Sequence, residues 1–427
     1  MNQCGFIPEK QVVRTLFATL LLLLICTSCG DVYRPVANPV IPPQPNPSFL
    51  HMVAVISGNG DNNPGASTTI DVSGDTAVSV STVGLLPVHA TFALGSARVY
   101  VANGSNDSVS SFSPAAATPV NTTSLPTGAN PVFVGTSEAA NTYVANKGNN
   151  TVSVVSNNTT FVTNTIPVGV APVALAELPN TQKVYVANQG NGGAGGSVTS
   201  INSIDGSVNS SAPLVGFGWV SPVWVVTRSD SQRAYVLDAG SGLVSAIDTS
   251  ADAVVNSVPV GVGANYMVYD PKLNRVYVVN PVAGTFTALA VTTDAMTATT
   301  VPVANALSVA ALPDGSRVYV SSAAVSGGNV TSSVTVLNTL NYAVKTKIPL
   351  GTKTLICATG TWSELPVAAA ADSTRVYVGN CDAEGTDIID TSSDTVLLVL
   401  PAPLSAQAPP PGGSPPPQNP VFVVAGP

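Results

Sequence analysis

Charged residues are scarce in this chain of 427 residues. Asp, Glu, Lys and Arg together make up 9%, against about 25% in a typical soluble domain. The 15 lysines and arginines form no basic run, and the net charge is −8. A nucleic-acid-binding surface needs clustered Lys and Arg side chains that contact phosphates. The sequence therefore argues against nucleic acid as a partner.

Histidine is scarcer still, with only His51 and His89 in the chain. A Ser-His-Asp site or a His-rich metal site is hard to assemble from two histidines. The sequence also lacks Gly-x-Ser-x-Gly, Cys-x-x-Cys-His and His-Glu-x-x-His, which carry hydrolytic, haem-binding and zinc chemistry. We therefore predict no catalytic residue, no cofactor and no metal site.

Turn-forming and strand-forming residues replace the missing charge. The chain has 36 Gly and 35 Pro, so turns must be frequent. Valine and threonine dominate between these turns, which favours strands over helices. The composition predicts an all-β fold.

The N-terminal segment has the pattern of an export signal. Lys10 and Arg14 precede an apolar run from Thr15 to Cys26, and this run is too short for a comfortable membrane span. The following Thr27-Ser28-Cys29-Gly30 resembles the lipobox of bacterial lipoproteins. We predict a signal peptide over residues 1–28; an ordinary secretory signal with a fortuitous cysteine is the alternative.

The lipobox resemblance implies that the thiol of Cys29 carries the lipid. Gly30 follows it in place of the aspartate that retains such proteins at the inner membrane of proteobacteria. We therefore expect an exported protein, lipid-anchored at the outer membrane or cell surface, that contacts the membrane through this lipid only. Residues 29–50 are rich in proline and are expected to form an extended tether.

A five-residue pattern, Val-Tyr-Val-Ala-Asn, recurs at Val99–Asn103 and Val184–Asn188. Close variants stand at Thr142–Asn146, Ala234–Asp238, Val276–Asn280, Val318–Ser322 and Val376–Asn380. The tyrosines of these copies are separated by 43, 42, 50, 42, 42 and 58 residues, and a degenerate copy, Ala54–Ser57, precedes them. A period of about 40 residues indicates a repeat architecture.

Each repeat contains signals for four short strands. One repeat shows them at Pro131–Val134, Thr142–Asn146, Thr151–Val155 and Ile166–Gly169, as a blade of a β-propeller requires. The paired motifs Tyr-Val-Ala-Asn and Pro-Val-Gly resemble the YVTN-type β-propeller repeat family over roughly residues 52–400. The resemblance implies a closed ring of four-stranded antiparallel blades, and it implies no single activity.

The C-terminal segment supplies the closure of the ring. Residues 401–420 are dominated by proline, but Val421–Val424 nearly repeats Val132–Val134, the first strand of another repeat. The degenerate first repeat lacks such a strand. We predict a propeller over residues 51–427 in which residues 421–424 complete the first blade. This count gives eight blades; seven is the alternative.

The insertions in the repeats indicate a functional face. If the first strand of each blade runs from top to bottom, the loops between strands two and three and the connections between blades lie at the top. The insertions Gln189–Ser197, Phe217–Trp219 and Lys353–Glu364 all fall there. The top-face residues that we predict to bind a partner are Phe217, Trp219, Trp362, Asp382 and Glu384.

The same topology places Cys357 and Cys381 at the top of one blade. We predict a disulfide between them because the protein is expected to be exported; two free thiols are the alternative.

Trp224 occupies a first-strand position and is expected in the core. We interpret the aspartates that follow the third strands as turn caps: Asp205, Asp248 and Asp390. Calcium binding by top-face carboxylates is a further alternative, through Asp61, Asp107, Asp382 and Glu384.

The sequence predicts a non-catalytic envelope lipoprotein that binds an envelope protein or a glycan through its top-face loops. One alternative is a propeller enzyme of the lactonase or lyase type. Such an enzyme needs charged or metal-binding groups near the central channel, where only Glu177 and Asp270 come close. The other alternative is a self-associating component of a surface coat.

Overall fold

The computed structural model describes residues 51–426, except for 59–62, 94–97, 115–119, 137–139, 193–194, 210–213, 215–216, 293–294, 358–359 and 405–416. The predicted signal peptide, Cys29 and the predicted tether lie outside the described residues, as does most of the proline-rich segment. In the part of the chain that the structure describes, no helix has the length and hydropathy needed to span a membrane.

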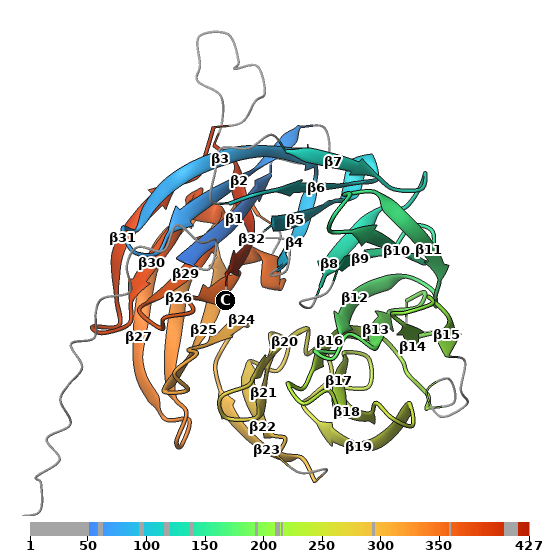
Figure 1. Cartoon of the computed structure of the whole chain (residues 1–427). Coiled ribbons are helices and arrows are strands. Elements are labelled where there is room, and N and C mark those ends of the chain that lie inside the picture. Colours follow the sequence, from blue (N-terminus) through green and yellow to red (C-terminus); the bar gives the residue numbers. More distant parts are fainter. Residues whose placement is uncertain are drawn as a thin grey trace, which may run out of the picture. The chain divides into compact units, whose positions relative to one another are not determined.

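The described chain forms eight four-stranded antiparallel sheets arranged as the blades of a ring (Figure 1). The predicted eight-bladed β-propeller is therefore confirmed. Strands of the first four blades, from the centre outwards, are β32 (Asn419–Ala425), β1 (Met52–Gly58), β2 (Pro64–Asp71) and β3 (Thr76–Leu85); β4 (Pro87–Ala93), β5 (Arg98–Asn103), β6 (Ser108–Phe112) and β7 (Asn121–Ser124); β8 (Pro131–Gly135), β9 (Asn141–Asn146), β10 (Thr151–Ser156) and β11 (Val162–Pro167); and β12 (Pro172–Glu177), β13 (Lys183–Asn188), β14 (Ser197–Asn202) and β15 (Val208–Asn209).

The other four blades follow the same order. Their strands are β16 (Pro222–Thr227), β17 (Arg233–Asp238), β18 (Leu243–Asp248) and β19 (Ala253–Pro259); β20 (Tyr266–Asp270), β21 (Arg275–Asn280), β22 (Thr285–Ala290) and β23 (Thr297–Pro302); β24 (Ala306–Ala311), β25 (Arg317–Ser326), β26 (Asn329–Asn338) and β27 (Val344–Thr354); and β28 (Val367–Ala369), β29 (Arg375–Asn380), β30 (Gly385–Asp390) and β31 (Thr395–Pro401). Short 3-10 helices lie at η3 (Gly104–Asn106), η4 (Trp362–Glu364) and η5 (Cys381–Ala383).

The last strand closes the ring as the sequence predicts. β32 pairs antiparallel with β1, with Val423 opposite Val55 and Phe422 opposite Ile56. The strand is longer at both ends than the predicted residues 421–424. Phe422 and Val423 are buried, so the two ends of the propeller are held together by a ladder and by apolar packing.

The tyrosine of the repeated motif lies between blades. All seven are fully buried: Tyr100, Tyr143, Tyr185, Tyr235, Tyr277, Tyr319 and Tyr377. They alternate along each second strand with valines or alanines that pack on the other side of the blade. Because both sides of a blade contact neighbouring blades, the inner strands are apolar throughout.

A polar contact at the bottom of the ring joins neighbouring blades. Asp252 has a left-handed φ of 49° in the turn between β18 and β19, and its carboxylate reaches back to the preceding blade. It accepts hydrogen bonds from Tyr185 and, at 2.9 Å, from Lys183 Nζ. Asp394 accepts from Arg317 and Tyr319 in the same way, and Asp75 from Arg375 and Tyr377. We call these contacts the blade locks.

The predicted turn caps are confirmed. Asp248 Oδ1 accepts the backbone N–H groups of Ser250 at 2.9 Å and Ala251 at 3.1 Å. Asp390 and Asp205 bind the backbone N–H of the residue two positions on. Side-chain oxygens that accept these N–H groups stabilise the tight turns, so the carboxylates have structural partners.

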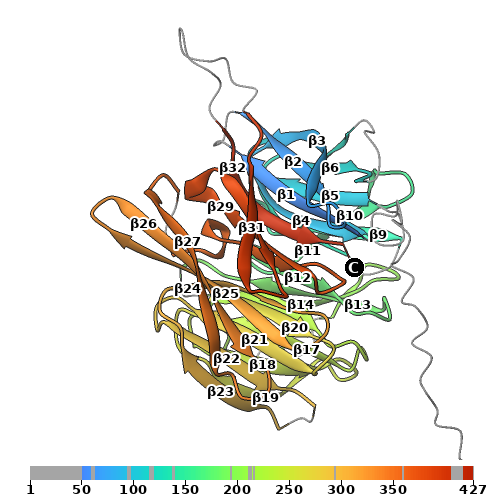
Figure 2. The same ribbon diagram turned by 90° about the vertical axis from the view of Figure 1, so that its left-hand side faces the viewer.

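One blade is longer than the sequence analysis expected. β25 and β26 have ten residues each and β27 has eleven, and their hairpin projects at the left of Figure 2. The Lys353–Glu364 insertion predicted from the sequence explains only part of the long spacing between Tyr319 and Tyr377. The rest comes from the hairpin, in which alternating residues such as Val330-Thr331-Ser332 extend the ladder.

Candidate functional site

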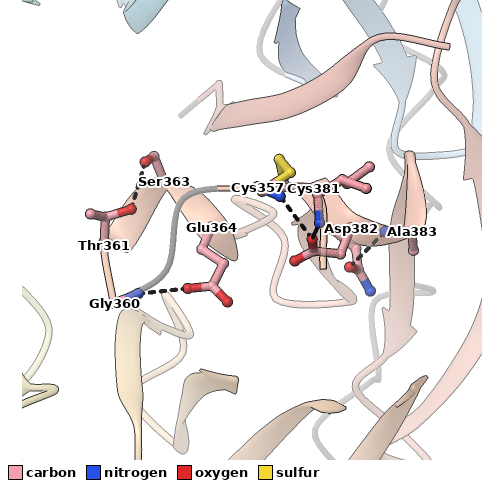
Figure 3. Close-up of a disulfide and its surroundings, with 10 residues drawn as sticks. Cys357, Gly360, Thr361, Ser363, Glu364, Cys381, Asp382 and Ala383 are labelled. Carbon is pink, nitrogen blue, oxygen red and sulfur yellow. Dashed lines mark hydrogen bonds between the residues drawn. A yellow bond between two sulfur atoms is a disulfide. The ribbon is translucent and has the colours of Figure 1, made fainter. Parts of the chain in front are cut away.

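The two top-face cysteines are joined by a disulfide between Cys357 and Cys381 (Figure 3). Cys381 begins η5 directly after the second strand of the eighth blade, and Cys357 lies in the connection from the seventh blade. The bond therefore ties this connection, residues 355–366, to the blade that it enters.

Asp382, a predicted binding residue, contacts the same connection. Its Oδ1 accepts the backbone N–H groups of Ile356 at 2.7 Å and Cys357 at 3.0 Å (Figure 3). Asp382 is buried, while its neighbour Glu384 is half-buried with a left-handed φ of 51°. The carboxylate of Asp382 thus holds the connection in place.

The Phe217–Trp219 insertion folds onto itself. The indole of Trp219 is 6% exposed, and its Nε1–H donates to the carbonyl oxygen of Leu214 at 2.8 Å. Phe217 is 37% exposed, and its ring lies 4.7 Å from that of Trp219. Only the phenyl ring therefore offers surface to a partner. The side chain of Trp362 lies outside the described residues.

Aromatic side chains gather at the centre of the ring, below the top face. His89 stacks on Phe133 with ring centroids 3.8 Å apart and lies 4.2 Å from Phe422. Phe133 contacts Trp224 at 5.4 Å, and Trp224 contacts Tyr266 at 4.6 Å. All five side chains are buried. We call this group the aromatic plug; it confirms the expected core position of Trp224.

Burial in the plug fixes the protonation of its ionisable members. It lowers the pKa of His89 to about 3, so the imidazole is neutral at physiological pH. His89 Nδ1 accepts the backbone N–H of Val134 at 3.4 Å. Burial likewise raises the pKa of Tyr266 to about 12. The plug is therefore an uncharged, tightly packed group.

A cavity of about 510 Å³ lies above the plug at the centre of the top face. Its wall is built mainly from the valines that follow the first-strand prolines of five blades: Val88, Val132, Val173, Val223 and Val421. Leu86, Pro87 and the ring of Trp224 complete the apolar surface. A cavity of this size and lining is typical of a site for a small molecule.

Polar side chains lie on opposite sides of this central cavity. Lys147 and Gln189 come from the loops after β9 and β13, while Asn265 precedes β20. Thr361 and Ser363 come from the connection that the disulfide holds. None of the five was predicted as a binding residue, although Gln189, Thr361 and Ser363 lie in insertions that the repeat pattern places at the top. A usable signal was present, because Asn265 stands where the repeat has valine, as in Pro222-Val223.

The seventh-to-eighth blade connection carries a buried carboxyl beside this rim. Glu364 is 2% exposed, and its Oε2 accepts the Gly360 N–H at 2.9 Å (Figure 3). Burial raises the pKa of Glu364 to about 7; the Gly360 N–H opposes the shift, and the charge of Asp382 adds to it. Glu364 is therefore an ionisable group in the segment that forms one wall.

The carboxylates considered for other chemistry have structural contacts. Asp270 accepts from the Lys272 N–H at 2.8 Å and from Tyr277 at 3.0 Å, and Asp107 accepts two backbone N–H groups. Glu177 is buried at the bottom end of β12. Within the described ranges, no three His, Cys, Asp or Glu side chains are arranged to hold a metal ion. Asp61 lies outside those ranges.

Comparison with known proteins supports the fold. The structure resembles that of apo AztD from Citrobacter koseri with a TM-score of 0.62 and 12% identity, over 88% of this chain and 98% of that one. It also resembles dihydro-heme d1 dehydrogenase NirN, with a TM-score of 0.60 and 11% identity over 90% of this chain and 76% of that one. A putative 6-phosphogluconolactonase from Bacteroides fragilis is similar with a TM-score of 0.52 and 14% identity, over 87% of this chain and 97% of that one. The shared feature is the β-propeller.

These identities are low, and the likeness shows the fold alone. No family model matches the chain, and no curated protein matches its sequence. Function must therefore be argued from the site, because one fold hosts many activities.

Proposed function

We propose that this protein is a non-catalytic envelope lipoprotein of the YVTN-type propeller class that binds a partner through its top face. The observation that carries the proposal is the central cavity: apolar walls, one Trp ring and a polar rim. A binding site needs apolar surface to remove from water and a few polar groups to orient the ligand, and the cavity offers both.

The lining of the cavity favours binding over catalysis. General acid–base or nucleophilic chemistry needs at least two reactive groups that face the reacting atoms. Among the described lining residues, Lys147 is the single ionisable group, and no carboxylate lines the cavity beside it. The propeller neighbours include proteins described as a lactonase and a dehydrogenase, so an enzyme remains the alternative proposal.

Site-specific crosslinking in intact cells tests the proposal. A photoreactive residue replaces Gln189 on the top rim; the matched control replaces Ser250, which is exposed in a bottom turn. We expect one recurrent adduct from position 189, and its loss when Val173→Phe fills the cavity. Equal adducts from both positions would contradict top-face binding. Adducts of the chain with itself alone would favour a surface coat.

The lipid anchor is tested separately. We expect Cys29→Ser to move the protein from the membrane fraction to the soluble fraction, because the lipid is the proposed link to the membrane. Mass spectrometry of the N-terminal peptide should find two or three acyl chains on the wild-type protein only. Retention of the variant in the membrane would contradict the anchor.

A further inference from the structure

Asn265 presents an unused acceptor at the central cavity. Its Oδ1 is buried and has no hydrogen-bond partner among the described residues, while its Nδ2 donates to the Gly360 carbonyl oxygen at 3.4 Å. A buried polar atom without a partner is unfavourable. Rotation of the Asn265 amide towards the cavity would let a ligand O–H or N–H donate to this oxygen and remove that cost.

Lys147 supplies the positive charge on the opposite side. Its Nζ lies 3.5 Å from Gln189 Oε1, at the limit of a hydrogen bond, and it forms no ion pair within the described part of the chain. An ammonium group has three donors. Lys147 can therefore bind an anionic group without breaking an existing ion pair.

The repeat shows that this charge is a departure and not a structural rule. The residue four positions after the motif tyrosine is small or apolar in the second, fifth, sixth, seventh and eighth blades: Gly104, Ala239, Pro281, Ala323 and Cys381. Lys147 and Gln189 are the long polar side chains in this series, and both line the cavity. The same holds for Asn265, which stands where five other blades have the valine that lines the cavity.

Between these polar groups the surface is apolar. Five valines and the side chain of Trp224 would contact the body of a ligand, and aromatic rings pack well against an indole. A sugar would leave most of its hydroxyls against these valines without partners. A dianionic phosphate would meet a single positive charge.

We propose that the cavity binds a compact monoanionic carboxylic acid with an aromatic or alicyclic ring. The carboxylate lies at Lys147 and Gln189, the ring packs against Trp224 and the valines, and a hydroxyl or amino group on the far side donates to Asn265 Oδ1. This inference rests on the proposed binding function and names the chemical class of its ligand.

Calorimetric titration of the full chain carrying Cys29→Ser, in detergent-free buffer, tests the proposal. The probes are 2-naphthoate, its neutral counterpart 2-naphthalenemethanol, and 6-hydroxy-2-naphthoate. We expect 2-naphthoate to bind more tightly than the alcohol, and Lys147→Gln to weaken 2-naphthoate about tenfold without changing the alcohol. Asn265→Val should remove only the gain due to the 6-hydroxyl group.

A cavity-filling variant and a matched control complete the design. Val173→Phe should abolish binding of all three probes, while Val255→Phe, the same change at a position 45% exposed on an outer strand, should not. Equal affinity for the acid and the alcohol in both wild type and Lys147→Gln would overturn the assignment of the anion. Binding that survives Val173→Phe would overturn the assignment of the cavity.

Failure of the ligand class and failure of the proposed function give different results. If no probe binds but position 189 still crosslinks to one partner, the carboxylic acid is wrong and top-face binding stands. If the probes bind as expected but the crosslinks do not depend on the top face, the ligand site stands and the proposed cellular role is wrong.

Discussion

The bottom and the top of the ring differ in how closely they follow the repeat. At the bottom, Asp75, Asp252 and Asp394 occupy the same turn position and bind the same Tyr and Lys or Arg positions of the preceding blade. At the top, Lys147 and Asn265 each depart from what the other blades have at that position. Residues that recur hold the blades together and form the apolar wall of the cavity, while residues that break the pattern add its polar groups.

This difference follows from what each end must do. A ring of similar blades repeats the same kind of interface, so one contact can serve at several of them. A small ligand at the centre meets all the blades at once and is not itself eightfold symmetric. Its recognition therefore requires individual blades to differ, and the comparison can be tested by substitutions at both ends.

Removal of the closing strand should have the largest effect. Deletion of residues 420–427 takes away Phe422 and Val423 together with the ladder to β1. We expect a loss of about 5 kcal/mol or more, since burial of one such side chain contributes about 1.5–3 kcal/mol. Thermal unfolding followed by circular dichroism measures it.

The control for this deletion shortens the proline-rich segment instead. Leu404 and Pro417 already pair across its base, so removal of residues 406–415 keeps the ends adjacent. We expect Tm to stay close to the wild-type value. If both deletions lowered Tm equally, closure by β32 would not be what stabilises the ring.

Loss of a blade lock should rank second. Asp252→Ala leaves Lys183 and Tyr185 without their common acceptor in a buried site, and we expect a cost of about 2–4 kcal/mol. The matched control, Asp205→Ala, changes an exposed turn aspartate of the adjacent blade and should lower Tm far less, because only a local turn cap is lost. Probe binding at the top should be unaffected in both variants.

The pH dependence of stability should reveal Glu364. Its pKa lies at about 7 in the folded protein against an ordinary value of 4.5, so the folded state favours the protonated form. Its contribution to stability is full below about pH 4.5 and is lost as the pH rises through about 7. Glu364→Gln should therefore be more stable than wild type at pH 8, by up to about 3 kcal/mol, since each pKa unit corresponds to about 1.4 kcal/mol.

The measurement compares the unfolding of wild type and Glu364→Gln between pH 4.5 and 8. His89 also makes stability depend on pH, because its lowered pKa reduces the free energy of unfolding as the pH falls below about 6.5. His89 is present in both proteins, so its effect cancels in the difference between them, which isolates Glu364. A difference that does not change with pH would show that Glu364 has an ordinary pKa.

Substitution at the rim should have the smallest effect on stability. Lys147 is exposed and its side chain makes one long hydrogen bond, so Lys147→Gln should change the free energy of unfolding by less than about 0.5 kcal/mol. Its effect should appear in ligand affinity alone. A large fall in Tm would mean that the top rim, like the bottom, is structural.

Much of the architecture could be predicted from the repeat. The seven tyrosine-containing copies together with the degenerate copy Ala54–Ser57 indicated eight blades, and the likeness of Val421–Val424 to Val132–Val134 indicated the closing strand. Both predictions depend on local patterns, which a single sequence displays. The cap role of Asp248 was also predictable, because its partners are the next few residues of the same turn.

Contacts between distant residues could not be predicted in this way. Asp252 lies 67 residues from Tyr185 in sequence, and nothing near Asp252 identifies its partner. The cavity could not be predicted for a related reason, since its lining residues come from separate blades and meet only in the closed ring. Trp219 turned its ring into its own loop, whereas the informative residues were departures inside regular strands and short loops.

The closing strand also has a consequence for the order of events in synthesis. The first blade is complete only after residues 419–425 have been synthesised, because they form its innermost strand and follow all the other strands in the sequence. Until then, Val53, Val55 and Ile56, which are buried in the finished ring, lack their inner cover. A shortened chain, from a stalled ribosome or a clipped C-terminus, would thus keep an open seam that quality-control proteases can recognise.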